Sequence, residues 1–209
     1  MQAEDYINAR AQLVIYHNLR RMLADRGYSV ERCGSEQHLM EKLLQCVENN
    51  EPVFQTTNPQ TRHRAVAFFP KNVKLSVGSF RAILEWVEAS VQENPTPSCC
   101  VLVVTEGGLT PVANNEMFAD HGCIHFESWK NAELAINITE HVIFSKHTAL
   151  SPEAAQQVLT QYQTTPDKLY QLRRDDPAAK YYALKPGTIV KVDRRLGLLP
   201  PYTVYRHVK

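Results

Sequence analysis

Acidic residues are missing from the places where a metal-dependent nuclease would need them. Such an enzyme holds Mg²⁺ and the attacking water with a carboxylate that leads into a strand carrying a second acid and a lysine. The strands predicted at residues 64–69 and 99–104 contain no acid. Glu127 and Lys130 lie three positions apart, so they cannot share one face of a strand. The sequence therefore predicts no metal-binding catalytic site of this kind.

Other enzyme signatures are also absent from the sequence. It contains no glycine-rich phosphate loop of either common pattern, no His-Glu-x-x-His, no Gly-x-Ser-x-Gly and no Cys-x-x-Cys. These absences exclude most hydrolases and most enzymes that use a nucleotide cofactor. We expect no catalytic residue, no cofactor and no small-molecule substrate.

Two histidines and a cysteine alternate at His121, Cys123 and His125. On a strand all three would point to one face, and zinc accepts both residue types as ligands. No fourth ligand is evident in the sequence. The alternative is an edge strand with two histidines beside a small buried cysteine, and this interpretation predicts no metal. The odd total of five cysteines fits reduced thiols better than a set of disulfides.

The loop from Glu106 to Pro111 is a candidate for contact with an anion such as a DNA phosphate. Gly107 and Gly108 break the preceding strand, and Thr110 before Pro111 has the pattern of a helix start. A helix start presents unpaired backbone N–H groups that attract an anion. The alternative is an ordinary turn between a strand and a helix.

The charge is distributed unevenly along the chain of 209 residues, although the net charge is only +1. Residues 1–139 hold 12 basic and 16 acidic side chains (−4), and residues 140–209 hold 11 and 6 (+5). With 44% hydrophobic and 22% charged residues the chain has the composition of a folded protein. No apolar run approaches the roughly 18 residues of a membrane span, so we expect no membrane contact.

Hydrophobic periodicity predicts an α/β layer followed by a small α+β region. Helices are expected at 3–26, 36–48 and 79–93 and from Thr110, and strands at 64–69, 99–105 and 123–126. In the second region, helices are expected to begin at Ser151 and Pro166, and strands to span 188–192 and 202–208. We therefore predict two domains, residues 1–139 and 140–209.

Several short motifs occur in an order and spacing that resemble one protein family. The amino-terminal region contributes Asp25-Arg26-Gly27-Tyr28, Leu109-Thr110-Pro111, and Ile136-Asn137-Ile138-Thr139 with His141. The carboxyl-terminal region contributes Lys146-His147 and a longer phrase, Asp176-Pro177, Tyr181, Leu184-Lys185, Gly187, Val190-Lys191, Arg194, Tyr202 and Tyr205-Arg206. From Leu19 to Lys209 the chain resembles the fifth common subunit of eukaryotic nuclear RNA polymerases, whose carboxyl-terminal domain is similar to a small subunit of the archaeal RNA polymerase.

The resemblance implies a non-catalytic polymerase subunit located in the nucleus, or in the nucleolus if it serves the ribosomal polymerase. Its amino-terminal domain would be a nuclease-like α/β layer without an active site, forming part of the jaw around downstream DNA. Gly107, Gly108, Thr110 and Pro111 would contact this DNA. The small α+β carboxyl-terminal assembly domain would dock on the largest subunit. A stand-alone DNA-binding or transcription-regulating adaptor of the same fold, and a metal-dependent nuclease, are the alternatives.

One loop departs from the family. Where the family has a polar Ser-Glu-Thr-x-Gly-Arg, this chain reads Leu-Gly-Leu-Leu-Pro-Pro at residues 196–201, which favours a divergent lineage or a paralog dedicated to one polymerase. Three leucines in so short a loop predict an interface with another protein, and the alternative is that they cover the domain's own strands. The partner-binding residues expected from the motifs and this loop are Lys185, Lys191, Arg194, Leu198, Leu199, Tyr202, Tyr205 and Arg206.

Overall fold

The computed structural model describes residues 3–30, 35–49, 51–194 and 200–209, with side chains of the first helix from Arg10 onward. The chain divides into two compact units, Met1–Ile136 and Asn137–Lys209. The sequence-based boundary lay after residue 139. The units carry the same charges as the two regions compared above, because residues 137–139 are uncharged.

A four-stranded mixed sheet forms the centre of the first unit, in the order β1-β2-β3-β4. β1 (Phe54–Thr57) is antiparallel to β2 (Arg64–Phe68), whereas β2, β3 (Cys99–Thr105) and β4 (Ile124–Lys130) are mutually parallel. The continuous apolar sequence of β3 follows from its central place, since helices cover both faces of a parallel sheet.

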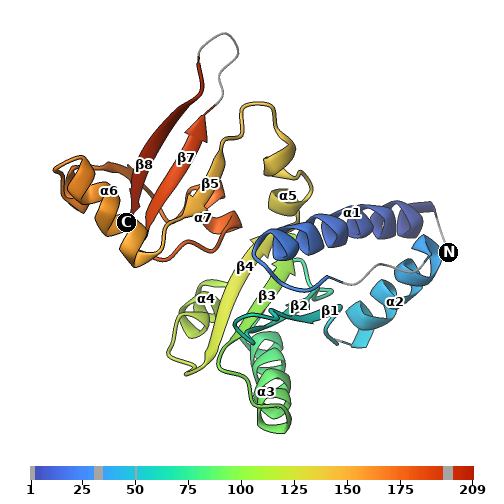
Figure 1. The fold of residues 1–209 in the computed structure, drawn as a ribbon. Helices are drawn as coiled ribbons and strands as arrows, with labels where there is room; N and C mark the ends of the chain where they lie inside the picture. The colour runs from blue at the N-terminus through green and yellow to red at the C-terminus, as the bar shows by residue number, and fades with distance from the viewer. Residues whose placement is uncertain (1–2, 31–34, 50, 195–199) are drawn as a thin grey trace. The chain divides into compact units, whose positions relative to one another are not determined.

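Helices lie on both faces of this sheet (Figure 1). α1 (Ala3–Asp25) and α2 (Glu36–Asn49) cover one face, and α3 (Val77–Glu93) and α4 (Pro111–Met117) cover the other. The short α5 (Asn131–Leu134) follows β4. α1 ends at Asp25, two residues before the expected stop at Gly27, which adopts a φ of +86° that is costly for other residues.

Strand alternation assigns side chains to the two faces. Val66, Val101 and Val103 point toward α3 and α4 and join the core that contains Phe80 and Ile83. The intervening residues of the strands face α1 and α2, where the largest buried side chains of α1 are Leu19, Met22 and Leu23. The two helical layers therefore bury both faces of the sheet.

The second unit contains a separate four-stranded sheet in the order β5-β7-β8-β6. β5 (Lys146–Ala149), β7 (Ile189–Arg194) and β8 (Tyr202–Val208) are antiparallel neighbours, and β6 (Tyr170–Leu172) runs parallel to β8. α6 (Pro152–Gln161), α7 (Pro177–Tyr181) and the 3₁₀ turns η1 (Ile138–Glu140) and η2 (Pro166–Lys168) complete it. Its small core consists of Leu172, Ala179, Val190, Val192 and Val208.

One expectation about an individual element is wrong, and one expected strand has different bounds. The helix predicted from Pro166 is only the 3₁₀ turn η2, and the chain then extends into β6. Pairing with β8 places Leu172 opposite Val208 in the core, so tertiary packing overrides the local helical pattern. The strand predicted at 123–126 begins at Ile124 and continues to Lys130.

Among the described residues, no helix has both the length and the apolar character needed to cross a membrane.

Candidate functional site

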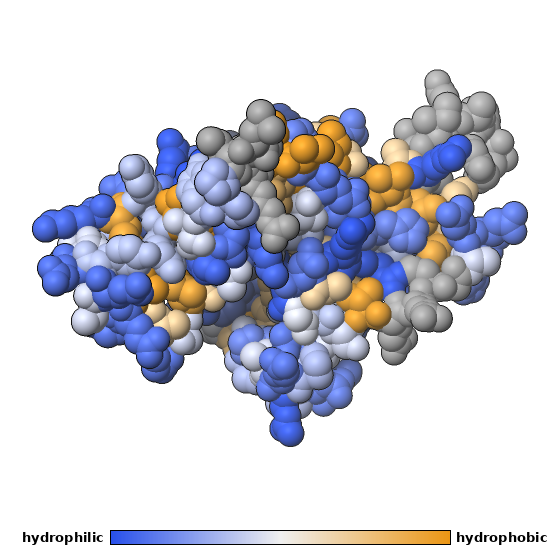
Figure 2. Space-filling view, turned by 45° about the horizontal axis from the view of Figure 1, so that its top comes forward, coloured by the Kyte–Doolittle hydropathy of each residue, from blue (hydrophilic) through white to orange (hydrophobic). Residues whose placement is uncertain are grey.

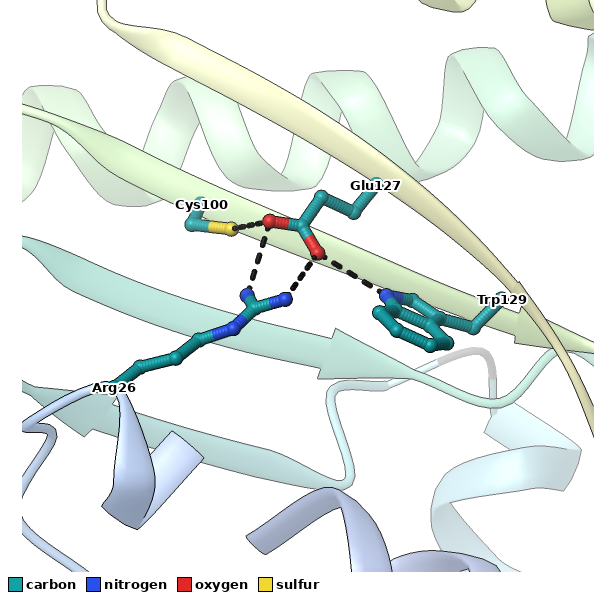
Figure 3. Close-up of polar contacts among 4 residues, drawn as sticks. All are labelled: Arg26, Cys100, Glu127 and Trp129. Atoms are coloured by element: carbon teal, nitrogen blue, oxygen red, sulfur yellow. Dashed lines mark hydrogen bonds and ion pairs between the residues drawn. The ribbon is translucent and has the colours of Figure 1, made fainter. Parts of the chain in front are cut away.

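One acid of the first sheet, Glu127, lies half-buried on the face of β4 covered by α1 (Figure 3). Arg26, just beyond the end of α1, donates from both terminal guanidinium nitrogens to the two carboxylate oxygens at 3.0 and 2.9 Å. Trp129 Nε1 donates to Oε2 at 3.1 Å, and Cys100 Sγ lies 3.4 Å from Oε1. A guanidinium thus binds both oxygens of this carboxylate.

Burial and pairing govern the protonation of this cluster. Burial tends to lower the pKa of Arg26, but the adjacent Glu127 carboxylate outweighs it and raises that pKa above its ordinary value. Burial, reinforced by the same carboxylate, raises the pKa of the Cys100 thiol well above its ordinary value. Arg26 therefore stays charged and Cys100 stays a thiol, which gives the cluster the properties of a structural ion pair.

The zinc geometry considered for His121, Cys123 and His125 does not form. His121 and Cys123 precede β4, so the three residues do not share a strand. The His121 ring packs near Phe126 on the α3 side, and Cys123 joins the core on that side. No cluster of three or more His, Cys, Asp or Glu side chains suited to a metal occurs in the described parts of the chain.

The loop from Gly107 to Pro111 is held by the segment before α3. Gly107 N donates to Val73 O at 2.6 Å, and Thr110 N donates to Leu75 O at 3.1 Å. Thr110 also caps α4 as expected, accepting from Ala113 N. These N–H groups are engaged within the protein, and Gly108 is buried with a φ of +80°. The glycines therefore serve the loop conformation, and Pro111 is its exposed residue.

Two exposed lysines flank this loop. A Cβ built on Gly107 would lie 3.1 Å from Lys74 Cγ, and one built on Gly108 would lie 3.5 Å from Lys130 Cε. The residues meet because β2, β3 and β4 are parallel, so the segments after their carboxyl ends share one edge of the sheet. Sequence spacing did not reveal these lysines, because their proximity depends on the order of the strands.

The expected partner-binding residues of the second unit lie on both faces of its sheet. Antiparallel pairing places Arg194 opposite Tyr202 and Arg206 opposite Val190, so these residues share the face that holds the core. Lys191 and Tyr205 pair on the other face. There Lys191 forms an ion pair with Asp193 at 3.1 Å, and the Tyr205 ring lies 5.7 Å from the Tyr162 ring. Lys185 is exposed in the turn before Gly187. Leu198 and Leu199 lie outside the described residues.

Arg194 and Arg206 line an open pocket of about 350 Å³, here called the arginine pocket. Its polar wall also contains His147 from β5 and Asp176, the residue that caps α7. Its apolar wall includes Ile138, Ile143 and Phe144. The motifs contained His147 and Asp176, but only the fold brings them together with the two arginines.

Charges around His147 define the electrostatics of the arginine pocket. Burial lowers the pKa of His147, and Arg206 and Arg194 act in the same direction. A hydrogen bond between its Nδ1 and Ser145 O and the charge of Asp176 oppose this shift. Since a carbonyl oxygen only accepts, the neutral imidazole carries its proton on Nδ1. The described pocket then has two positive charges and one negative charge.

Comparison with known proteins finds a match for the second unit. Residues 136–208 match the family model described as RNA polymerase Rpb5, C-terminal domain. This range agrees closely with the unit Asn137–Lys209 of the structure.

Similarity to polymerase subunits extends over nearly the whole chain. The chain is 24% identical over 99% of both lengths to "DNA-directed RNA polymerases I, II, and III subunit RPABC1" of Caenorhabditis elegans. It is 27% identical to the corresponding Dictyostelium discoideum subunit, over 93% of this chain and 95% of that one. It is 26% identical to "DNA-directed RNA polymerase subunit 5-like protein 1" of Arabidopsis thaliana, over 89% and 90%. The resemblance seen in the motifs is confirmed: residues 136–208 match the model of the Rpb5 C-terminal domain, within a chain similar to RNA polymerase subunits along nearly its whole length.

Proposed function

We propose that this protein is a non-catalytic subunit of a multisubunit DNA-directed RNA polymerase. The observation that carries the proposal is the similarity to polymerase subunits over 99% of the chain, with a family match that coincides with a structural unit. The pairing of Glu127 with Arg26 supports a non-catalytic role, because this carboxylate is already neutralised. Nucleotidyl transfer would then be carried out by other subunits.

The location of the protein follows from this assignment. The relatives are named as subunits of RNA polymerases I, II and III, which are eukaryotic enzymes that act in the nucleus. We therefore place the protein in the nucleus, and in the nucleolus if it serves polymerase I. No cofactor or small-molecule substrate enters this function.

The first unit would form part of the jaw around downstream DNA. Lys74 and Lys130 beside the loop Gly107–Pro111 support this role, because they add positive charge to an edge of an otherwise acidic unit. Two lysines provide a weak contact with phosphates that depends on salt and is indifferent to base sequence. The lysines, rather than the glycine backbone, would supply most of the attraction.

The second unit would dock on the largest subunit. Its net charge of +5 and the arginine pocket support a binding role for this unit. On one face of the molecule, hydrophobic residues gather in small patches separated by hydrophilic ones (Figure 2). A docking surface on the second unit would combine apolar contacts with charge complementarity.

Purification of the tagged chain from its own cells tests the proposal. Mass spectrometry is expected to find the large polymerase subunits in stoichiometric amounts, and the composition identifies which polymerase the protein serves. A chain that binds duplex DNA or regulators but recovers no polymerase subunit would instead be the stand-alone adaptor. Cleavage of DNA with Mg²⁺ or Mn²⁺ by the pure chain, lost on Glu127→Gln, would overturn the non-catalytic assignment.

A further inference from the structure

The two arginines of the arginine pocket carry polar atoms that the described residues do not satisfy. The Nε atoms of Arg194 and Arg206 are buried and have no hydrogen-bond partner among the described residues. A buried N–H of a charged group without an acceptor is costly, and in native structures a water, a ligand or a partner usually supplies the acceptor. Both arginines that line the pocket therefore carry a buried donor without an acceptor among the described residues.

The only described carboxylate in the wall of the arginine pocket is already engaged elsewhere. Asp176 Oδ1 accepts a hydrogen bond from Ala178 N at 2.9 Å, which fixes this side chain at the start of α7. Two guanidinium groups, one carboxylate and a neutral imidazole leave the pocket with one uncompensated positive charge. One negative charge from outside the chain would balance it.

The apolar wall restricts the chemistry of the occupant. Ile138, Ile143 and Phe144 face the pocket, and Ile143 and the adjacent Val142 are 70% and 95% exposed. Exposed β-branched residues at the rim gain from contact with other apolar side chains. A volume of about 350 Å³ accommodates one or two side chains rather than a domain surface. The pocket fits a carboxylate on a short aliphatic stem, carried by a segment with apolar neighbours.

We propose that the arginine pocket receives an Asp or Glu side chain from an apolar-flanked segment of another polymerase subunit. The proposal rests on the proposed function and adds to it the site and the chemistry of docking. The carboxylate accepts hydrogen bonds from Arg194 and Arg206, and flanking apolar residues of the segment cover Val142 and Ile143. A nucleic-acid backbone is a poorer occupant, because its repeated phosphates gain nothing from the apolar wall.

Charge reversal within the purified polymerase tests the site. Arg194→Glu and Arg206→Glu are compared with wild type and with Arg174→Glu, a matched reversal at an exposed arginine of the same unit. The tagged chain is washed on the affinity resin through a salt series, and the retained polymerase subunits are quantified. Either pocket reversal is expected to reduce retention about tenfold or more, whereas Arg174→Glu leaves it near wild type. Thermal melting of each free chain shows whether the variant is folded.

The partner residue is identified by photo-crosslinking. A photoreactive amino acid in place of Ile143 is expected to capture a peptide of a polymerase subunit that contains an Asp or Glu. Reversing that acid to Arg should restore the retention of polymerase by the Arg206→Glu chain. An unfolded Arg206→Glu chain could not be rescued in this way. If Arg206→Glu does not fold, Arg206→Gln and Arg206→Lys take its place. Arg206→Gln is expected to lose the bound polymerase, and Arg206→Lys is expected to retain part of it.

The outcomes separate the two proposals. If wild type recovers no polymerase, the proposed function fails. Suppose instead that wild type recovers polymerase, and that Arg194→Glu and Arg206→Glu retain as much of it as Arg174→Glu does. Then only the arginine pocket proposal is wrong. Crosslinking to nucleic acid, or to a peptide without an acid, also overturns it.

Discussion

At the scale of single residues, the ion pair of Arg26 and Glu127 fixes the end of α1 to the sheet. The Arg26 side chain is 5% exposed and that of Glu127 is 22% exposed, so both have given up most of their hydration. The bidentate geometry and the additional bond from Trp129 compensate this loss. Removing one partner leaves the other as an unpaired buried charge.

Arg26→Met is therefore expected to destabilise the chain by about 3 kcal/mol, measured by urea denaturation. The matched variant is the double substitution Arg26→Met with Glu127→Leu, which removes both charges and should recover much of the loss. Equal destabilisation by the single and double substitutions would contradict the assignment of Glu127 as the compensating partner.

His147 gives the stability of the second unit a dependence on pH. Burial lowers its pKa below the ordinary 6.5, and Arg206 and Arg194 add to the shift while Ser145 and Asp176 oppose it. The unfolded chain then binds a proton at His147 more tightly than the folded chain does. The stabilisation is complete above pH 6.5 and is lost as the pH falls from there through the folded pKa.

We therefore expect the melting temperature to fall between pH 7.5 and pH 5, and His147→Gln to flatten this dependence. The exposed His38 of α2 provides the control, because His38→Gln should leave the slope unchanged. An unchanged slope in His147→Gln would show that other groups dominate the acid sensitivity.

At the scale of elements, the three parallel strands of the first unit bring distant loops to one edge. The segment Val73–Leu75 lies beside the loop Gly107–Leu109, joined by the parallel bridge between Leu75 and Leu109. Lys130, at the end of β4, reaches the same loop. This convergence makes a cationic edge from two lysines that are 56 positions apart in the sequence.

Lys74→Gln combined with Lys130→Gln should weaken retention of downstream duplex by the assembled polymerase. The affinity for DNA falls as the salt concentration rises. Each lysine–phosphate pair that is removed makes the slope of log affinity against log salt less steep by about 1. Lys42→Gln, at an exposed position of α2, is the control for a generic change of charge. Assembly should be unaffected in all variants, and identical salt dependence of the double variant and the control would refute the contact.

Elements with strong local signals were predicted from the sequence. β3 and β8 have the predicted bounds, and α1 ends at Asp25, within one residue of its predicted end and just before Gly27. Thr110 caps α4 because its hydroxyl and the following proline encode a helix start locally. For these elements, neighbouring residues in the sequence are sufficient to predict the structure.

Elements that depend on tertiary partners were missed. β1 and β5 are four residues each and have little periodicity of their own. β6 was predicted as part of a helix because its local sequence has a helical pattern. This segment becomes a strand only through its pairing with β8. The arginine pocket was missed for the same reason. Arg194 and Arg206 were proposed from the motifs, but the fold reveals their common face and their unsatisfied nitrogens.

At the scale of the whole molecule, the two units have opposite charge and separate cores. The first unit has a net charge of −4 and buries both faces of its sheet, whereas the second has +5 and a core of a few residues. A domain of about 70 residues buries a smaller fraction of its surface than a larger one and is less stable for that reason. A partner that covers its exposed apolar residues would add stability.

The fragment 137–209 should therefore fold alone, but melt at a lower temperature than the full chain, and it should enter the polymerase without residues 1–136. The physical reason is that its sheet, its helices and the arginine pocket are all contained within it. Circular dichroism shows whether it folds, and co-purification with polymerase subunits shows whether it assembles. The fragment 1–136 is the matched control and should be recovered without polymerase. If 1–136 assembles and a folded 137–209 does not, the first unit is the one that docks, and the roles of the two units are reversed.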